Sequence, residues 1–258
     1  MTNLAANLSM MFNEVDFLDR FEAAAKAGFK GVEYLFPYDY SAEQIKDKLD
    51  KYNLTQVLFD FPAGDWDAGD RGCASFPDRV GEFQDGVGKA IEYAKVLECG
   101  RLTVLAGKAT SNVSAITMHN TLVDNMKFAS EAVAGSDITV LLEAINTIDI
   151  PGYSVFRTNQ SRAVVEATGA DNVKVQYDIY HMQIMEGDVT RTIDNNMDVI
   201  GHFQLADNPG RHEPGSGEIN YDFLLPHIDS LGYEGWIGCE YAPAGDTVSG
   251  LLWAAKYL

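Results

Sequence analysis

Short apolar runs rich in β-branched and aromatic residues alternate along this chain with longer stretches in which apolar residues recur at helical spacing. The short runs predict strands over residues 4–8, 31–35, 55–60, 102–105, 138–143, 173–178, 202–206 and 236–240. The periodic stretches predict helices over residues 16–27, 41–52, 77–97, 114–134, 159–168, 188–195 and 221–231, and a last helix from about residue 250. The segment 62–79, rich in glycine and aspartate, is expected to be mostly a long loop.

This regular alternation indicates an α/β fold built on a parallel sheet. Eight strand–helix units in 258 residues give about 32 residues each, which is the length typical of a unit in a (β/α)8 TIM barrel. We therefore expect a single TIM-barrel domain over residues 1–258. An open doubly wound sheet is the alternative, and it is weakened because no G-x-G-x-x-G or G-x-x-x-x-G-K turn follows the first strand.

Side chains point alternately to the two faces of a strand, and in a barrel the outward set lies beneath helices and should be apolar. Along residues 173–178 the apolar set is Val173, Val175 and Tyr177, so Asp178 should point inward. The same argument gives four inward carboxylate or amide side chains at or near strand ends: Glu143, Asp178, Gln204 and Glu240. They follow one another at intervals of 26 to 36 residues, so they should converge at one mouth of the barrel.

Buried carboxylates are costly unless a cation balances them. Because carboxylate and amide oxygens are the ligands of hard divalent cations, the four residues predict a metal site. An ion pair of Lys174 with Glu143 or Asp178 is the alternative that needs no metal, although the amide of Gln204 would add nothing to it. Glu33, at the matching position of the second strand, is a candidate for contacting the substrate or for supporting the metal ligands.

Composition restricts the partners and the compartment. A formal net charge of −19 repels nucleic acid and anionic membranes, and no run approaches the roughly 20 apolar residues of a membrane span. The first residues lack the basic region of a secretory signal, and the three cysteines show no C-x-x-C spacing. We therefore expect a cytoplasmic protein with reduced thiols, whose partner is a small molecule.

A small anionic substrate would need local cationic groups, because the overall charge repels it. His181 follows Asp178 by three residues, at the strand-to-loop edge where a TIM barrel places its chemistry. Arg211 lies on the loop after the Gln204 strand and suits bidentate binding of a carboxylate. Arg71 and Lys108 are further candidates for binding the substrate.

Several of these residues lie in stretches that resemble the hydroxypyruvate isomerase family, within the xylose-isomerase-like TIM barrels. The resemblance covers essentially the whole chain. The stretches that carry it are ANLSMMF (6–12), GVEYLFPY (31–38), PAGDW with GDRG (62–72), DIYH (178–181), GRHEP with GEINY (210–221) and GWIGCEY (235–241).

The resemblance implies that Glu143 and Glu240 are the proton-transferring pair. It also implies that Glu143, Asp178, Gln204 and Glu240 bind a divalent metal ion, magnesium first and manganese as an alternative. The expected reaction interconverts hydroxypyruvate and tartronate semialdehyde through a metal-stabilised enediolate. The partner is thus a small anionic hydroxy-oxo-acid.

Two alternatives follow from the same resemblance. The family also contains 2-oxo-tetronate isomerases, which act on a four-carbon sugar acid. Family members often read Glu-Pro-Ile-Asn-Thr-Arg where this chain has Glu143-Ala-Ile-Asn-Thr-Ile148, so an arginine that the resemblance would offer for the polar end of the substrate is absent from this loop. A metal-dependent phosphodiesterase of the endonuclease IV type shares the barrel, but five histidines and a net charge of −19 argue against it.

Overall fold

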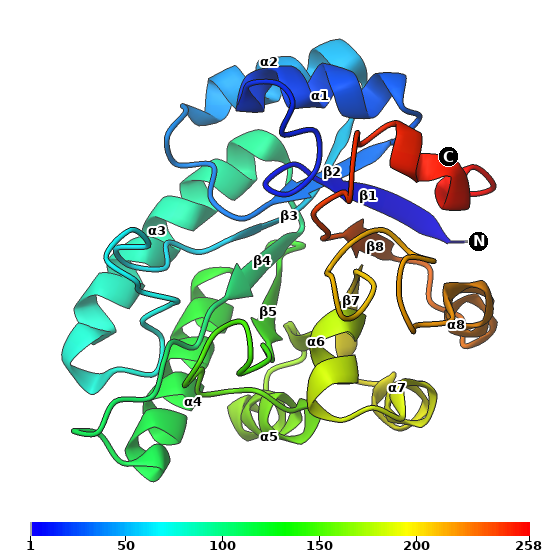
Figure 1. The fold of residues 1–258 in the computed structure, drawn as a ribbon. Coiled ribbons are helices and arrows are strands. Elements are labelled where there is room, and N and C mark those ends of the chain that lie inside the picture. Colours follow the sequence, from blue (N-terminus) through cyan, green and yellow to red (C-terminus); the bar gives the residue numbers. More distant parts are fainter. Residues whose placement is uncertain (1) are drawn as a thin grey trace.

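The computed structural model describes residues 2–258, and its strands form one closed parallel barrel in chain order (Figure 1). The predicted TIM barrel is therefore confirmed. The strands are β1 (Asn3–Asn7), β2 (Gly31–Tyr34), β3 (Thr55–Asp60), β4 (Arg101–Val104), β5 (Thr139–Glu143), β6 (Val173–Asp178), β7 (Ile200–Leu205) and β8 (Trp236–Cys239).

Helices form a ring outside the strands (Figure 1). They are α1 (Phe17–Lys26), α2 (Ala42–Tyr52), α3 (Val80–Leu97), α4 (Ala115–Ala132), α5 (Thr158–Thr168), α6 (Ile179–Met185), α7 (Val189–Asn196) and α8 (Tyr221–Ser230). Two short 3-10 helices, η1 (Pro77–Arg79) and η2 (Ser249–Ala254), complete the set. The sequence predicted the helices except α6, and the last segment is a 3-10 helix where an ordinary helix was expected.

Local sequence explains where these elements begin. At α2 the Ser41 hydroxyl accepts from the Gln44 amide at 3.2 Å, and the Gln44 side chain accepts from the Ser41 amide at 3.0 Å. This capping box satisfies two backbone donors that the first turn leaves without partners. Ile45 and Leu49, four residues apart, then pack the helix against the barrel.

The barrel interior has an apolar floor and a polar upper part. Ala5, Val57, Leu58 and Leu141 form a small cluster inside the barrel, and Trp236 packs against it. The side chains nearer the carboxyl ends of the strands are polar and buried, and they include Asn7, Glu33, Asp60, Thr103, Glu143, Gln176, Asp178, His202 and Gln204. A TIM barrel is usually filled by layers of branched apolar side chains, so this polar upper layer marks the end that carries the chemistry.

A close approach between two strands depends on a glycine. A Cβ added at Gly238 of β8 would overlap the carboxylate of Glu33, which projects from β2 into the lumen. We expect Gly238→Ala to lower the free energy of unfolding by about 1–3 kcal/mol, the usual cost of overpacking a filled interior. Gly88→Ala in α3, where an added Cβ meets open space, should instead raise it by up to about 1 kcal/mol. Urea denaturation of both variants measures the difference, and an equal response in the two would contradict the packing argument.

Candidate active site

The four residues predicted from strand parity lie at the carboxyl end of the barrel. Glu143 is the last residue of β5, Asp178 is the last residue of β6, and Glu240 directly follows β8. Gln204 lies near the end of β7, where it is the register partner of Asp178. All four side chains are buried. Residues far apart in the sequence therefore meet at the mouth where TIM-barrel enzymes hold their active sites.

Three of the carboxylates share one small space with a histidine. One ligand atom from each of Glu143, Asp178, His181 and Glu240 lies within 4.8 Å of the other three. Gln204 lies beside Asp178 in the strand register, and its side chain bonds to residues outside this acidic cluster. Its side-chain nitrogen donates to Glu33 Oε1 at 2.8 Å, and its oxygen accepts from Gln176 Nε2 at 2.6 Å.

The positive charge beside the acidic cluster comes from Arg211. Its Nη2 lies 2.6 Å from Glu240 Oε2 and 3.8 Å from Asp178 Oδ2, and its guanidinium lies 5.1 Å from the Tyr180 ring centroid. The alternative ion pair of Lys174 with these acids is wrong. Lys174 begins the inward set of β6 at the opposite end of the strand, where its Nζ donates to the Asp198 carbonyl at 3.1 Å.

One guanidinium cannot neutralise three buried carboxylates, and the pKa values reflect this. Burial raises the pKa of Glu143 well above its usual value, and the neighbouring Glu240 and Asp178 raise it further. Burial also raises the pKa of Glu240 to about 8 and that of Asp178 to about 6, although Arg211 lowers both. Raised carboxyl pKa values of this kind are typical of carboxylates held together in a site with little water.

The donor set fits a hard divalent cation. Glu143 Oε1 and Asp178 Oδ2 are buried and accept no hydrogen bond from any residue in the described range 2–258. Buried carboxylate oxygens without donors are rare in folded proteins, because each one costs desolvation free energy. A cation held by Glu143, Asp178 and Glu240, with the amide oxygen of Gln204, would satisfy them. The residues therefore support a hard divalent cation of the class to which magnesium and manganese belong.

His181 lies on the helix that the sequence analysis missed. Asp178 is the N-cap of α6, and its Oδ1 accepts from the Tyr180 amide at 2.8 Å. The other oxygen, Oδ2, faces the acidic cluster, 3.5 Å from His181 Nε2. An aspartate before an apolar stretch is a helix-start signal, and it could have revealed α6.

Glu33 lies beneath the acidic cluster, on the inner wall of the barrel. Its two oxygens take part in hydrogen bonds with Asn7 Nδ2 at 3.1 Å, Gln204 Nε2 at 2.8 Å and His202 Nε2 at 2.9 Å. The carboxylate is fully buried and its oxygens are engaged by protein groups. Of the two roles expected for Glu33, this placement favours support of Gln204 and of Asn7, which also donates to Glu240 Oε1 at 3.3 Å. Contact between Glu33 and the substrate stays a prediction.

Arg71 and Lys108 lie outside the acidic cluster. Together with Asp70 and Arg79 they line a separate recess of about 380 Å³. The Arg71 guanidinium stacks 3.9 Å from the Trp66 ring centroid and donates to two backbone carbonyls of its own loop. The structure does not bring these two residues into contact with the acidic cluster, and a role in binding the substrate stays a prediction.

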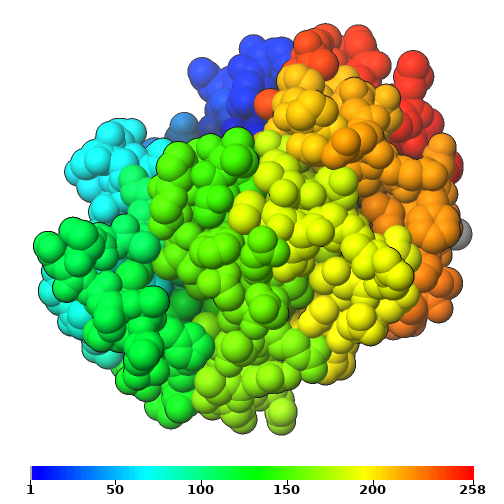
Figure 2. Space-filling view, turned by 60° about the horizontal axis from the view of Figure 1, so that its bottom comes forward, coloured from blue at the N-terminus to red at the C-terminus, as the bar shows by residue number. Residues whose placement is uncertain are grey.

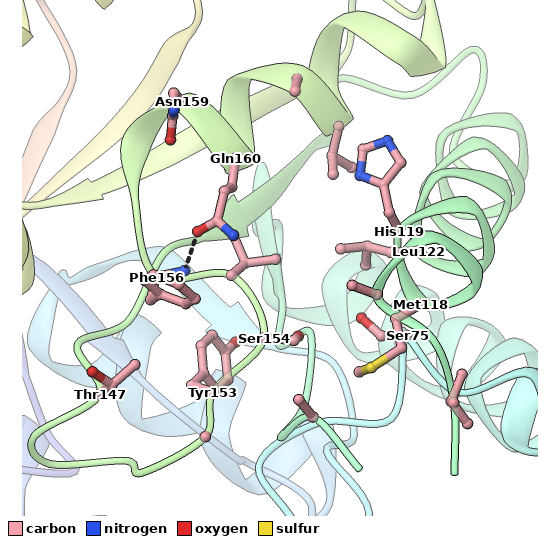
Figure 3. A pocket seen from close by; sticks show the side chains of 17 residues that line it. Ser75, Met118, His119, Leu122, Thr147, Tyr153, Ser154, Phe156, Asn159 and Gln160 are labelled. Carbon is pink, nitrogen blue, oxygen red and sulfur yellow. Dashed lines mark hydrogen bonds between the residues drawn. The ribbon is translucent and has the colours of Figure 1, made fainter. Parts of the chain in front are cut away.

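A larger cavity of about 840 Å³ lies between α4 and the loop that joins β5 to α5 (Figure 3). Met118, His119 and Leu122 of α4 face Tyr153 and Phe156 of this loop across it. Its lining contains no carboxylate and none of the predicted site residues. Size alone would therefore point to the wrong place, because the reactive groups lie in the polar mouth of the barrel.

Two functional candidates escaped the sequence analysis. Asp60 ends β3 on the inward side, and burial together with Glu240 and Glu33 raises the pKa of its carboxyl well above the usual value. The rule that found the other strand-end acids could have found it. Asn146 lies on the loop after β5 and contacts His181 Nδ1 at 2.7 Å. Loop contacts of this kind have no periodic sequence signal.

The comparisons with known proteins agree with the fold. Residues 21–257 match the family described as xylose isomerase-like TIM barrel. The chain is 49% identical to hydroxypyruvate isomerase of Escherichia coli (strain K12), over 100% of both chains. It is 47% identical to 2-oxo-tetronate isomerase of Cupriavidus necator, over 100% of this chain and 99% of the relative.

A solved structure shows a similar level of sequence identity to this chain. A crystal structure from Brucella melitensis, described as an AP endonuclease of family 2, superposes with a TM-score of 0.98 at 47% identity, covering 100% of this chain and 99% of that one. The fold and the site thus define a TIM barrel of the xylose isomerase-like type. The chain belongs to this family, and within it to the group of hydroxypyruvate isomerases and 2-oxo-tetronate isomerases.

The raised carboxyl pKa values make metal binding depend on pH in a defined direction. Because the folded-state pKa values of Asp178 (about 6) and Glu240 (about 8) are raised, protonation stabilises the metal-free fold at low pH, and this contribution is lost as the pH rises through those values. A divalent cation competes with those protons. We therefore expect the rise in Tm caused by Mg²⁺ to be small near pH 5 and to grow towards pH 9.

Calorimetry of metal-free and magnesium-loaded protein at several pH values measures this increment. At a magnesium concentration a hundred times Kd the stabilisation should reach about 2.7 kcal/mol. Asp178→Asn removes one of the four expected ligands and should abolish most of the increment. A magnesium effect that is the same at every pH, or is unchanged in Asp178→Asn, would contradict a site at this cluster.

Proposed function

We propose that this protein is a divalent-metal-dependent isomerase that interconverts hydroxypyruvate and tartronate semialdehyde. The observation that carries the proposal is the pair Glu143 and Glu240, two buried carboxylates that face one space at the barrel mouth and whose pKa values are raised. Identity of 49% over the full length to a hydroxypyruvate isomerase supports it.

The reaction needs a proton to leave one carbon and another to reach its neighbour. The C–H proton leaves C3 of hydroxypyruvate, a proton is delivered to C2, and the hydroxyl proton moves from the C3 oxygen to the C2 oxygen. Two carboxylates from different strands suit this exchange, because one accepts a proton while the other supplies one without a large movement of the substrate. A bound divalent cation supplies positive charge where negative charge develops on the substrate's oxygens.

A cation lowers the pKa of a carboxylate that it binds, which weakens that carboxylate as a base. Burial acts in the opposite direction, and it is the largest influence on the pKa of both Glu143 and Glu240. The two effects therefore act in opposite directions on the basicity of the two glutamates. Arg211 touches Glu240 and not Glu143 within ion-pair distance, so the two carboxylates differ in their surroundings.

Arg211 would bind the carboxylate of the substrate in this proposal. Its Nη2 contacts Glu240, whereas its buried Nε has no hydrogen-bond partner within the described part of the chain, residues 2–258. A buried guanidinium nitrogen without an acceptor is costly, and an incoming carboxylate would satisfy it. Ile148, on the loop after β5, is uncharged and 73% exposed, so it contributes no cationic group to the site.

A four-carbon substrate is the second candidate. Identity of 47% to a 2-oxo-tetronate isomerase is nearly as high as that to the hydroxypyruvate isomerase. The same two glutamates would serve both reactions, since only the far end of the sugar acid differs. The reaction type is therefore better supported than the substrate length.

Phosphodiester hydrolysis is less well supported, although the similar Brucella structure is described as an AP endonuclease. Within residues 2–258 the acidic cluster contains one histidine among three carboxylates. The formal net charge of −19 opposes the approach of DNA.

Among the helices within residues 2–258, none has the length and hydropathy of a membrane-spanning helix.

Replacing either glutamate tests the proton transfer. We expect Glu143→Gln and Glu240→Gln each to lower kcat about 10²–10⁴-fold, because an amide cannot exchange the proton. Proton NMR of hydroxypyruvate incubated in D₂O follows both aldehyde formation and exchange of the C3 protons. Glu131→Gln, exposed on α4, is the matched control and should keep full activity. Unchanged activity in both site variants would reject the two-glutamate scheme.

Kinetics with oxo-acids of three and four carbons test the substrate. We expect kcat/KM to be larger for hydroxypyruvate than for 2-oxo-tetronate. The reverse order would assign the chain to the second reaction while keeping the site. Activity with neither acid, in protein that binds magnesium, would reject the proposed reaction.

A further inference from the structure

The role of His181 depends on which of its ring nitrogens carries the proton. Nε2 lies 3.5 Å from Asp178 Oδ2 and 3.6 Å from Glu143 Oε1, so position alone would allow it to be a fifth metal ligand. A histidine that binds a metal through Nε2 usually donates its Nδ1–H to a carboxylate, a carbonyl or a water. The group that contacts Nδ1 therefore determines whether Nε2 can bind a metal or carries a proton and donates a hydrogen bond.

That group is the side-chain amide of Asn146, at 2.7 Å. Asn146 Oδ1 accepts from the backbone amides of Ile148 at 3.0 Å and Asp149 at 2.8 Å. Its Nδ2 donates to Asp149 Oδ2 at 3.0 Å, and that oxygen also accepts from Tyr180 Oη at 2.9 Å. Turning the amide over would set its NH₂ against two N–H groups and its oxygen against a carboxylate, so the nitrogen is fixed towards His181.

An amide nitrogen is only a donor. His181 Nδ1 must then accept, which leaves no proton on it. The His181 side chain is buried, which favours the neutral imidazole. The single ring proton therefore lies on Nε2 and faces the acidic cluster. The part of the chain that runs from the loop after β5 to α6, green to yellow in Figure 2, forms one continuous face of the molecule.

We propose that Asn146 is a positioning residue that holds His181 as the neutral Nε2–H tautomer, so that His181 donates a hydrogen bond to a substrate oxygen and does not bind the metal. This inference rests on the proposed function for the identity of the acceptor. The tautomer itself follows from the contacts of Asn146. At 3.5 and 3.6 Å the two carboxylate oxygens are too far to satisfy Nε2–H fully, and an oxygen of the substrate can take its place.

Long-range ¹H–¹⁵N correlation of histidine-labelled protein reads the tautomer directly. His181→Gln identifies the His181 signals among the five histidines. In the magnesium-loaded protein without substrate we expect the pattern of a neutral Nε2–H ring. A wild-type His181 protonated on Nδ1, or on both nitrogens near neutral pH, would overturn the proposal whatever the activity.

Asn146→Asp replaces the hydrogen-bond donor at His181 Nδ1 with an acceptor. A carboxylate accepts from Nδ1–H, so Nε2 loses its proton and becomes free to bind a metal. We expect the NMR pattern to invert and kcat to fall about 10- to 100-fold with a smaller change in KM, the effect of losing a hydrogen bond that strengthens in the transition state. Affinity for Zn²⁺, which favours nitrogen ligands more than Mg²⁺ does, should rise.

Two controls separate the tautomer from charge and from folding. Asn159→Asp adds the same charge at the exposed start of α5 and should change neither the NMR pattern nor kcat. Asn146→Ala removes the donor without adding charge and should give a mixture of both ring forms. An unchanged Nε2–H pattern in both Asn146 variants would overturn the proposal. If the expected tautomers are observed but the wild type turns over no oxo-acid, the proposed function is rejected and the assignment of the tautomer stands.

Discussion

The structure around the active site depends on one electrostatic constraint: three carboxylates lie buried together with one guanidinium. Like charges at such separations repel strongly where water is scarce. Arg211 offsets part of this repulsion through Glu240 at 2.6 Å, and the N-terminus of α6 offsets another part through Asp178. Glu143 Oε1 has neither kind of partner within residues 2–258. Burial, together with this remaining imbalance, raises the carboxyl pKa values, and a divalent cation would fit the same place.

The sequence was sufficient to predict the barrel and the meeting of Glu143, Asp178, Gln204 and Glu240, because both follow from local regularities. Side-chain alternation is a property of each strand, and the unit length repeats along the chain. Alternation gives the face of the strand on which a side chain lies, and it does not give the position of that side chain along the lumen. Lys174 has the inward parity of Asp178 but lies four residues earlier, about 13 Å along the strand. The cation beside the acids is instead Arg211, from a loop whose path no periodicity describes.

The missed helix shows a second limit. α6 follows β6 without a loop, and Asp178 serves both as the last strand residue and as the helix cap. A segment of seven residues is too short for helical periodicity to stand out, so the sequence predicts only the end of a strand and the start of a loop at DIYH. α6 carries His181, whose Nδ1 contacts Asn146 on the loop after β5. This contact could not be predicted without knowing that α6 and that loop lie side by side.

Two side chains in this site are chemically ambiguous, and each is resolved by a neighbour that allows one answer. An amide can present oxygen or nitrogen, and a carboxylate such as Glu33 accepts from a nitrogen, so the Gln204 nitrogen faces Glu33 and its oxygen is left for Gln176 and for a cation. A neutral imidazole can donate or accept at Nε2, and the Asn146 nitrogen at Nδ1 leaves it a donor. In the proposed arrangement, the support beneath and beside the acidic cluster leaves oxygen atoms that could hold a cation and, at His181 Nε2, one group that could only donate a hydrogen bond. A polar lumen lowers the free energy of unfolding relative to an apolar one. The same polar side chains make this division of roles possible, which an apolar lumen could not.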